Sequence, residues 1–274
     1  MRHAFTAVAA GAAALALAFL VLPVVALFLK VPPGDLWHAL GTSAARDALV
    51  VSVKTSAIAH AAVLGVGTPA AWALARHRVP GRSVVLSLIE LPLVLPPAVA
   101  GIALLVAFGR FGLLGGALDF LGVRLAFTQA AVVIAVAFVE SPFYVRGAIA
   151  SFESIDDTLL EAARTLGAKP FRVFARVAVP LAAGGLGAAS ALALARGLGE
   201  FGATLLFAGS LQGMTQTLPL AIYAQFEVDF DTALAIGALF VVFGIAVLLA
   251  LKLLPGWTRS VSLSPFRSAS SPST

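Results

Sequence analysis

Long apolar segments constrain the fold of this chain more than any other feature of its sequence. A transmembrane helix needs about 20 mostly apolar residues, and six windows meet that requirement: residues 5–29, 49–75, 84–108, 127–145, 181–207 and 232–254. Apolar residues make up 60% of the chain and charged residues only 11%, whereas a soluble domain needs far more polar surface to cover itself. The sequence therefore predicts an all-α membrane protein with six transmembrane helices.

The two ends of the chain differ in character. The first window follows Arg2 like a signal peptide, but its apolar stretch of about 24 residues exceeds the 7–15 of a signal's central region, so we expect a retained span. We expect residues 1–254 to form one transmembrane domain. Residues 255–274 are rich in Ser and Pro and predict a short disordered tail.

Basic residues in the loops set the expected orientation, because cytoplasmic loops carry the excess of Lys and Arg. A cytoplasmic N-terminus places four basic residues outside and twelve inside, and the C-terminus then also lies in the cytoplasm. The twelve are Arg2, Arg76, Arg78, Arg82, Arg146, Arg164, Lys169, Arg172, Arg176, Lys252, Arg259 and Arg267. This distribution explains the net charge of +5 without a nucleic-acid partner.

The loop at residues 151–180 predicts two short cytoplasmic helices. Ser154 is the expected N-cap of the first, with acids in its first turn. Gly167 fits a left-handed C-terminal residue and Pro170 the first turn of the second helix. An apolar stripe at helical spacing is predicted on the first helix, formed by Ile155, Leu159, Ala162, Ala163 and Leu166.

Two interpretations of this loop follow from its residues alone. An amphipathic hairpin could lie on the membrane surface with its basic face against anionic headgroups. Alternatively, acids mixed with small alanines could form a docking element for a soluble partner. The residues alone leave both interpretations open.

A family pattern bears on this choice. The run Glu161-Ala162-Ala163, three residues, Gly167, nine residues and Val177-Ala178-Val179-Pro180 resembles the EAA loop of ABC importer permeases, with Val at the two aliphatic positions. The resemblance implies an all-α fold of the type I importer permease kind. It also implies that Glu161, Ala162, Ala163, Gly167 and Pro180 belong to a coupling helix seated on an ATPase subunit.

Two further segments narrow the resemblance. Residues 91–115 and 195–209, the latter followed by TQTLPLAIY at 215–223, are similar to molybdate-type permeases, although the GEFGA run is shared with sulfate and thiosulfate permeases. The resemblance implies an inner-membrane subunit that imports an oxyanion delivered by an external binding protein. It further implies a second copy of the chain and two ATPase subunits as partners.

The chain lacks the sequence motifs of P-loop nucleotide hydrolases, zinc proteases and serine hydrolases. No G-x-x-x-x-G-K-[ST], H-E-x-x-H or G-x-S-x-G occurs, there is no cysteine, and His3, His38, His60 and His77 lack metal-ligand spacing. We therefore expect a non-catalytic subunit with no cofactor of its own, and Mg-ATP bound by its partner.

Apart from Lys252 near the end of the sixth window, five charged residues fall inside the windows, and a charge at the bilayer centre costs about 2.5–3.5 kcal/mol on insertion scales. They are Lys54, Glu90, Glu140, Arg196 and Glu200. They either line a water-filled path or neutralise one another, Arg196 with Glu200 and Lys54 with Glu90. Because Gly197, Gly199 and Gly202 surround Arg196 and Glu200, that pair is a candidate gate or packing element.

Prolines and an outer loop complete the candidate pathway. Pro92, Pro96 and Pro97 interrupt the third window and predict a bend. The bend is either a kink that results from packing or the mark of a helix that lines a pore. In the segment 209–231, Thr215, Gln216 and Thr217 could help an oxyanion pass, but we expect the segment to be largely hydrated. The alternatives to an ATP-driven oxyanion importer are the same machine carrying sulfate, thiosulfate or tungstate, and a gradient-driven secondary transporter.

Overall fold

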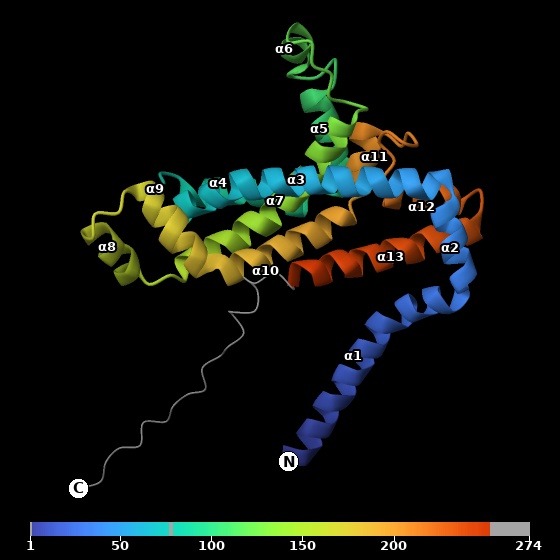
Figure 1. Cartoon of the computed structure of the whole chain (residues 1–274), viewed down its shortest axis with the longest axis horizontal. Coiled ribbons are helices and arrows are strands. Elements are labelled where there is room, and N and C mark those ends of the chain that lie inside the picture. Colours follow the sequence, from blue (N-terminus) through green and yellow to red (C-terminus); the bar gives the residue numbers. More distant parts are fainter. Residues whose placement is uncertain (1, 77–78, 253–274) are drawn as a thin grey trace.

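The computed structural model describes residues 2–76 and 79–252, and this part of the chain is helical throughout its regular structure (Figure 1). The long helices are α1 (Arg2–Lys30), α3 (Ser43–Arg76), α7 (Gln129–Glu153), α10 (Val179–Leu198) and α13 (Phe230–Lys252). The shorter ones are α2 (Pro33–Gly41), α4 (Arg82–Val94), α5 (Pro97–Phe108), α6 (Gly115–Phe120), α8 (Asp157–Thr165), α9 (Pro170–Val173), α11 (Gly202–Ala208) and α12 (Leu218–Phe226). A π-helical turn, Phe174–Ala178, joins α9 to α10. The prediction of an all-α membrane protein is confirmed.

Five helices in the described ranges are long and apolar enough to cross a membrane, and a sixth crossing results if α4 and α5 count as one broken span. The bend predicted from the prolines of the third window is present, and it divides the window into two helices, because α4 and α5 meet at an angle of 116°. Leu95 adopts an extended backbone with ψ of 128°, as expected of a residue that precedes proline. Pro96 therefore ends α4, and the chain leaves the bundle sideways as α5 (Figure 1).

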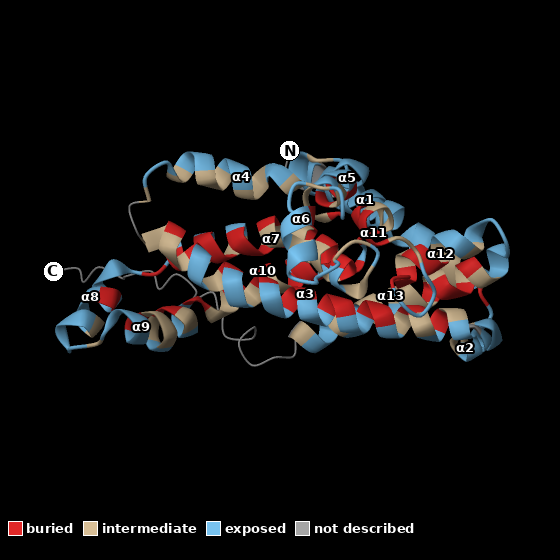
Figure 2. Cartoon of the chain, turned by 90° about the horizontal axis from the view of Figure 1, so that it is seen from above, coloured by how far each residue is buried: buried red, intermediate tan, exposed pale blue. Residues whose placement is uncertain are grey.

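The core of the bundle consists of α3, α7 and α10. Their facing surfaces carry small and β-branched residues, and Figure 2 shows buried residues on these inner faces. A Cβ added at Gly147 of α7 would lie 2.5 Å from the Cβ of Ala189 on α10, so the two backbones approach closely. Close approach of this kind is how membrane helices gain packing energy where lipid removes the hydrophobic driving force.

The fifth window is also broken. Helix α10 ends at Leu198, and after a short irregular segment α11 begins at Gly202. The Glu200 carboxylate accepts a hydrogen bond of 2.8 Å from the backbone N–H of Ala203, so a buried acid satisfies one of the free donors at the start of α11. The helix is therefore broken locally near Gly197, Gly199 and Gly202, the glycines that surround Arg196 and Glu200.

Different loops lie at the two ends of the bundle. Helix α8 lies at one end of the long axis and α2 at the other, while α1 and the α5–α6 arm extend away from the bundle on different sides (Figure 1). This arrangement places the 151–180 loop opposite the segment that joins the first two spans. The predicted tail at 255–274 and the predicted inner residues Arg78, Arg259 and Arg267 lie outside the described residues.

Candidate functional site

The predicted coupling loop forms two helices joined by a tight turn. Gly167 has a φ of +83°, the left-handed conformation that favours glycine. Its N–H donates to the carbonyl of Arg164 at 2.9 Å, and the N–H of Ala168 donates to that of Ala163 at 3.0 Å. These bonds form a Schellman motif, and Pro170 starts α9. The predicted helix–turn–helix, with Gly167 as its C-terminal residue, is confirmed.

The predicted N-cap of the first helix is wrong. Ser154 instead follows the last residue of α7 and donates to the carbonyl of Ser151 at 2.8 Å. Asp156 caps α8, because its carboxylate accepts from the N–H of Thr158 at 2.9 Å. This hydrogen bond lowers the pKa of the Asp156 carboxyl below its ordinary value.

The predicted apolar stripe is divided between two environments: Ile155 and Ala163 pack against the bundle, whereas Leu159, Ala162 and Leu166 are exposed. Ile155 is buried just before the helix, and within α8 the buried residue is Leu160, which lies off the predicted stripe. Leu159 is 49% exposed and Leu166 88% exposed, and Figure 2 shows most of α8 as exposed. Within the described part of the chain, Leu159 and Leu166 therefore form an exposed apolar surface at the tip of the molecule.

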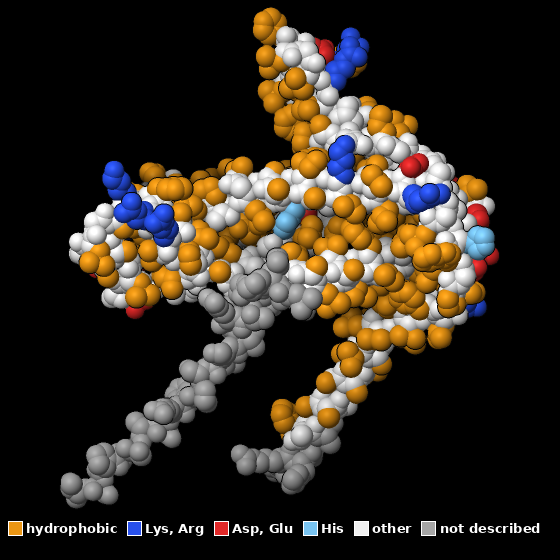
Figure 3. Space-filling view, viewed as in Figure 1, with side chains coloured by type: hydrophobic (Ala, Val, Ile, Leu, Met, Phe, Trp, Pro, Cys, Tyr) orange, Lys and Arg blue, Asp and Glu red, His pale blue; other side chains and the backbone are white. Residues whose placement is uncertain are grey.

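The residues of the EAA pattern differ in their exposure at this surface. Glu161 and Ala162 are exposed, whereas Ala163 is half-buried and packs against the core of the bundle. Lys and Arg side chains gather over the same end of the molecule in Figure 3. The tip thus combines exposed apolar groups with a basic border.

Pro180 lies where the loop joins the bundle. Proline has no N–H to donate to the carbonyl four residues earlier, and the turn before it is π-helical, with the N–H of Val179 bonded to the carbonyl of Phe174. A π-turn accommodates one extra residue within a continuous helix, often at functional sites. The loop therefore continues into α10 without an interruption.

An arginine joins the coupling loop to the end of α3. Arg76 donates from Nη1 to Asp157 Oδ1 at 2.5 Å and from Nη2 to the carbonyls of Ile155, at 2.7 Å, and Phe152. Its guanidinium also lies over the ring of Trp72, with 5.9 Å between Cζ and the ring centroid. From the sequence, Arg76 was expected only to lie on the cytoplasmic side of the membrane, because its partners are about 80 residues away in the chain.

Two of the charges inside the spans, Lys54 and Glu90, have partners that the sequence did not predict. The expected pair of Lys54 with Glu90 is wrong. Lys54 Nζ donates to Gln129 Oε1 at 2.8 Å, at the start of α7. Glu90 pairs with Arg146 at 3.3 Å across α4 and α7. These contacts join helices far apart in sequence, so spacing along the chain could not reveal them.

Glu140 and His60 form a buried contact in the centre of the bundle. His60 Nδ1 lies 3.0 Å from Glu140 Oε2, and His60 Nε2 lies 2.8 Å from Ser190 Oγ. One imidazole thereby joins α3, α7 and α10. Sequence analysis assigned His60 no role, and no local pattern distinguishes it from the other histidines.

The predicted pair of Arg196 with Glu200 is present. Arg196 Nη1 lies 3.2 Å from Glu200 Oε2, and the Glu200 side chain is buried while that of Arg196 is partly exposed. Pro97 contacts the position of Gly202, where an added Cβ would lie 2.7 Å from the proline Cβ. The structure thus brings Pro97 of the third window next to the break between α10 and α11. A gating role for Pro96, Pro97, Arg196 and Glu200 stays a prediction.

The outer segment is less hydrated than expected. Thr215, Gln216 and Thr217 are buried, whereas Glu227, Asp229 and Asp231 are exposed. Thr215 Oγ1 accepts from the N–H of Leu211 at 3.0 Å, so it stabilises its own turn. A role for Thr215 and Thr217 in the pathway stays a prediction.

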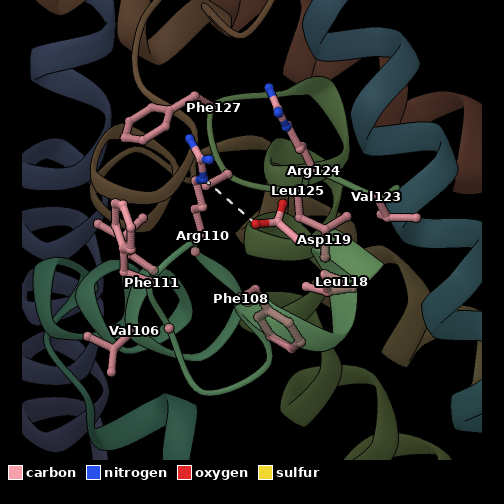
Figure 4. Close-up of a pocket in the computed structure, with 15 residues that line it drawn as sticks. Val106, Phe108, Arg110, Phe111, Leu118, Asp119, Val123, Arg124, Leu125 and Phe127 are labelled. Carbon is pink, nitrogen blue, oxygen red and sulfur yellow. Dashed lines mark ion pairs between the residues drawn. The ribbon is translucent and has the colours of Figure 1, made fainter. Parts of the chain in front are cut away.

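A separate cavity of about 560 Å³ lies in the arm formed by the end of α5, α6 and the segment that follows. Figure 4 shows Arg110 and Asp119 pointing toward one another beside it, with 3.7 Å between Nε and Oδ2. None of the predicted site residues lines this cavity. Within residues 2–76 and 79–252, no group of three or more potential ligands could hold a metal ion.

Comparisons with known proteins agree with this architecture. The model of the family described as the binding-protein-dependent transport system inner membrane component matches residues 65–260. The molybdenum transport system permease protein ModB of Mycobacterium bovis is 46% identical over 233 residues, which cover 84% of this chain and 88% of that protein. ModB of Escherichia coli K12 is 41% identical over 182 residues, 66% of this chain and 80% of that protein.

A sulfate transport permease and two solved transporters are also similar. The sulfate transport system permease protein CysW of Synechocystis sp. is 35% identical over 210 residues, 77% of this chain and 76% of that protein. A chain of a bacterial alginate ABC transporter, solved with its periplasmic protein, has a TM-score of 0.73 at 16% identity and covers 90% of this chain and 92% of that chain.

A chain of the MetNI methionine ABC transporter in an inward-facing conformation has a TM-score of 0.58 at 16% identity, covering 74% of this chain and 90% of that chain. At these identities the solved structures establish the fold alone, which is that of ABC importer permeases. The family model and the ModB relatives extend the likeness to sequence. This chain therefore belongs to the family of binding-protein-dependent transport system inner membrane components.

Proposed function

We propose that this chain is the permease subunit of an ATP-driven importer and that its cargo is molybdate, delivered by an external binding protein. The family match and the two ModB relatives support this cargo. Sulfate, thiosulfate and tungstate are competing cargoes, and the CysW relative specifically favours sulfate as the second candidate.

The exposed face of α8 is the observation that carries the proposal. A helix that exposes apolar residues such as Leu159 and Leu166 fits a groove on another protein, and the Schellman turn and the Arg76 contacts fix its position. In this proposal the transporter contains two copies of the chain and two ATPase subunits. The α8 helix of each copy binds one ATPase subunit. Glu161, Ala162, Ala163 and Gly167 form the docking helix, and Pro180 lies where it joins α10.

The chain itself supplies motion rather than chemistry. Mg-ATP binds in the partner, and this subunit holds no cofactor. Closure and opening of the ATPase pair would favour an outward-facing and an inward-facing state in turn, provided that ATP binds the two states with different affinity. A gate formed at the junction of α5, α10 and α11 would respond, with Pro96, Pro97, Arg196 and Glu200 beside it and Thr215 and Thr217 on the outer side.

The proposed location is the bacterial-type inner membrane, with both chain ends in the cytoplasm. The basic residues at the α8–α9 end support this orientation, because Lys and Arg concentrate on the cytoplasmic side. The external binding protein would then meet the opposite end of the bundle, where α2 and the exposed acids near the start of α13 lie.

Cysteine crosslinking tests the docking interaction, because the chain has no native cysteine. Leu166→Cys, on the exposed face, is expected to crosslink to the cognate ATPase subunit in membranes. Leu160→Cys is the matched control, since Leu160 is buried and should not react. If Leu166→Cys never reaches the ATPase, or labels from the outer side of the bilayer, the proposed docking role is wrong.

Uptake by proteoliposomes tests the cargo and the energy source. Vesicles that contain this chain, the ATPase and the binding protein should take up radiolabelled molybdate only with ATP inside. Excess unlabelled sulfate should leave this uptake unchanged if molybdate is the cargo and should suppress it if sulfate, the second candidate, is the cargo. Uptake by vesicles that lack the ATPase would indicate a gradient-driven transporter instead.

A further inference from the structure

We propose that Arg76 is a positioning residue that ties the docking helix α8 to the end of α3, so that a displacement of α8 moves α3 with it. This inference rests on the proposed function, because it assigns to Arg76 the transmission of movement from the ATPase into the bundle. It concerns a residue outside the 151–180 loop and outside the EAA pattern.

The contacts of Arg76 reach both sides of the α7–α8 junction. One nitrogen of the guanidinium binds the carbonyls of Phe152 and Ile155, and the other binds the carboxylate of Asp157 in the first turn of α8. The carbonyl of Phe152 also accepts from the N–H of Ile155 at 3.3 Å, and a carbonyl oxygen has two lone pairs, so Arg76 adds a second hydrogen bond at the end of α7. A single side chain of α3 thereby holds the last turn of α7 and the first turn of α8.

Burial makes this connection firm on the side of α3. The Arg76 side chain is 11% exposed, whereas that of Asp157 is 76% exposed. Trp72, one turn earlier on α3, covers the guanidinium and also packs edge-on against Phe152, with 5.3 Å between ring centroids. The donor is therefore immobilised within the bundle, while its acceptor lies on the helix that is proposed to be displaced.

Arginine is specifically suited to this position. Its planar guanidinium presents several donors in a fixed arrangement, whereas lysine offers one nitrogen on a flexible chain. A lysine at this position keeps the positive charge but cannot contact the carbonyls and the carboxylate with the same geometry. If the role of Arg76 were only to neutralise Asp157, lysine would suffice.

The continuity of α3 carries the movement further. This helix extends without interruption from Ser43 to Arg76, and His60 within it contacts Glu140 and Ser190 on the two other core helices. A shift at Arg76 is thus passed along one helix to the contact that joins α3, α7 and α10. The hydrogen bonds of neighbouring Arg82 go to α3 and α7 instead: it donates to the carbonyl of Leu74 at 2.8 Å and to Glu153 at 2.5 Å.

The test compares uptake with hydrolysis in reconstituted transporter. The measured quantity is molybdate taken up per ATP hydrolysed, in proteoliposomes that contain the chain, its ATPase and its loaded binding protein. Arg76→Lys is expected to lower this ratio about tenfold, within the 5–150-fold range of typical coupling between sites. Asp157→Asn, which weakens only the contact to α8, should lower it less, and Arg82→Lys should leave it within about twofold of wild type, as expected for an exposed ion pair.

The outcomes separate a positioning role from a structural one. A purely structural defect lowers the amount of assembled complex, and with it hydrolysis and uptake in equal proportion, so the ratio stays constant and the inference is overturned. An equal loss in Arg76→Lys and Arg82→Lys also overturns it. If wild-type vesicles show no ATP-dependent uptake, the proposed function fails first, and a working wild type with a normal Arg76→Lys ratio refutes the role of Arg76 alone.

Discussion

Glu140 Oε2 lies 3.0 Å from His60 Nδ1 in the centre of the bundle, with the glutamate side chain fully buried. The second oxygen, Oε1, has no hydrogen-bond partner among the described residues. An ionisable group in a membrane span needs a partner, because an isolated charge there is costly. The His60 imidazole is therefore the group that allows the Glu140 side chain to be buried in the bundle.

Removal of His60 should destabilise the protein strongly. His60→Ala leaves the buried carboxyl without its partner, and loss of one member of a buried pair costs about 3–5 kcal/mol. We expect a marked fall in the thermal unfolding midpoint of the purified protein in detergent, measured by intrinsic fluorescence.

A double-mutant cycle shows whether this loss comes from the pair. Glu140→Gln keeps the volume, and its amide oxygen can still accept a hydrogen bond from His60, so it should cost less than His60→Ala. In the Glu140→Gln background, the His60→Ala change should cost less than it does alone, since no charge is left unpaired. Strictly additive losses would contradict the assigned interaction.

Gly197 allows Glu140 to occupy its position. A Cβ at residue 197 would lie 2.0 Å from Glu140 Oε1 and 2.5 Å from its Cγ. Gly197→Ala should therefore destabilise by about 1–3 kcal/mol, the usual cost of overpacking, and lower the unfolding midpoint. Gly65→Ala on α3 is the control: a Cβ there meets nothing within 4 Å, and alanine is the better helix former. Equal effects of the two changes would exclude the steric explanation.

Local signals in the sequence predicted local structure well. Gly167 and Pro170 determine the turn between α8 and α9 through their own backbone preferences, so that turn was predictable. The choice of Asp156 over Ser154 as N-cap depends on where α7 ends, at Glu153. No residue before position 154 signals that end.

Contacts between distant segments were not predictable in the same way. Lys54 pairs with Gln129 rather than Glu90 because the start of α7 lies beside α3, a fact of tertiary packing. Periodicity also identified an apolar stripe at α8 without indicating that Leu159 and Leu166 face outward while Ile155 and Ala163 pack inward. An apolar face for a partner and one for the protein's own core have the same pattern.

The cap of α8 should weaken in acid. The N–H of Thr158 holds the pKa of the Asp156 carboxyl below its ordinary value, which is about 4. A lowered folded-state pKa contributes stability that is fully present above the unfolded pKa and is lost as the pH falls through the folded pKa. Protection of α8 amides against hydrogen exchange, corrected for intrinsic rates, should therefore fall below about pH 4.

Asparagine at the same position separates the cap from its titration. Asp156→Asn can still accept the bond from Thr158 but carries no titrating carboxyl. Its α8 protection should lack the acid step at this residue. The same decline in wild type and variant would assign the step to another group.

The left-handed turn at Gly167 should be required for coupling but not for membrane insertion. A β-branched residue at a φ of +83° is strongly disfavoured, so Gly167→Val should displace α8 from its position and lower molybdate uptake per ATP hydrolysed. Open space surrounds this Cβ position, so a clash cannot cause the loss. Gly167→Asn, which tolerates the left-handed conformation, should restore most of the ratio. Uptake that is normal with valine, or that is equally poor with asparagine, would show that the conformation of residue 167 does not position the docking helix.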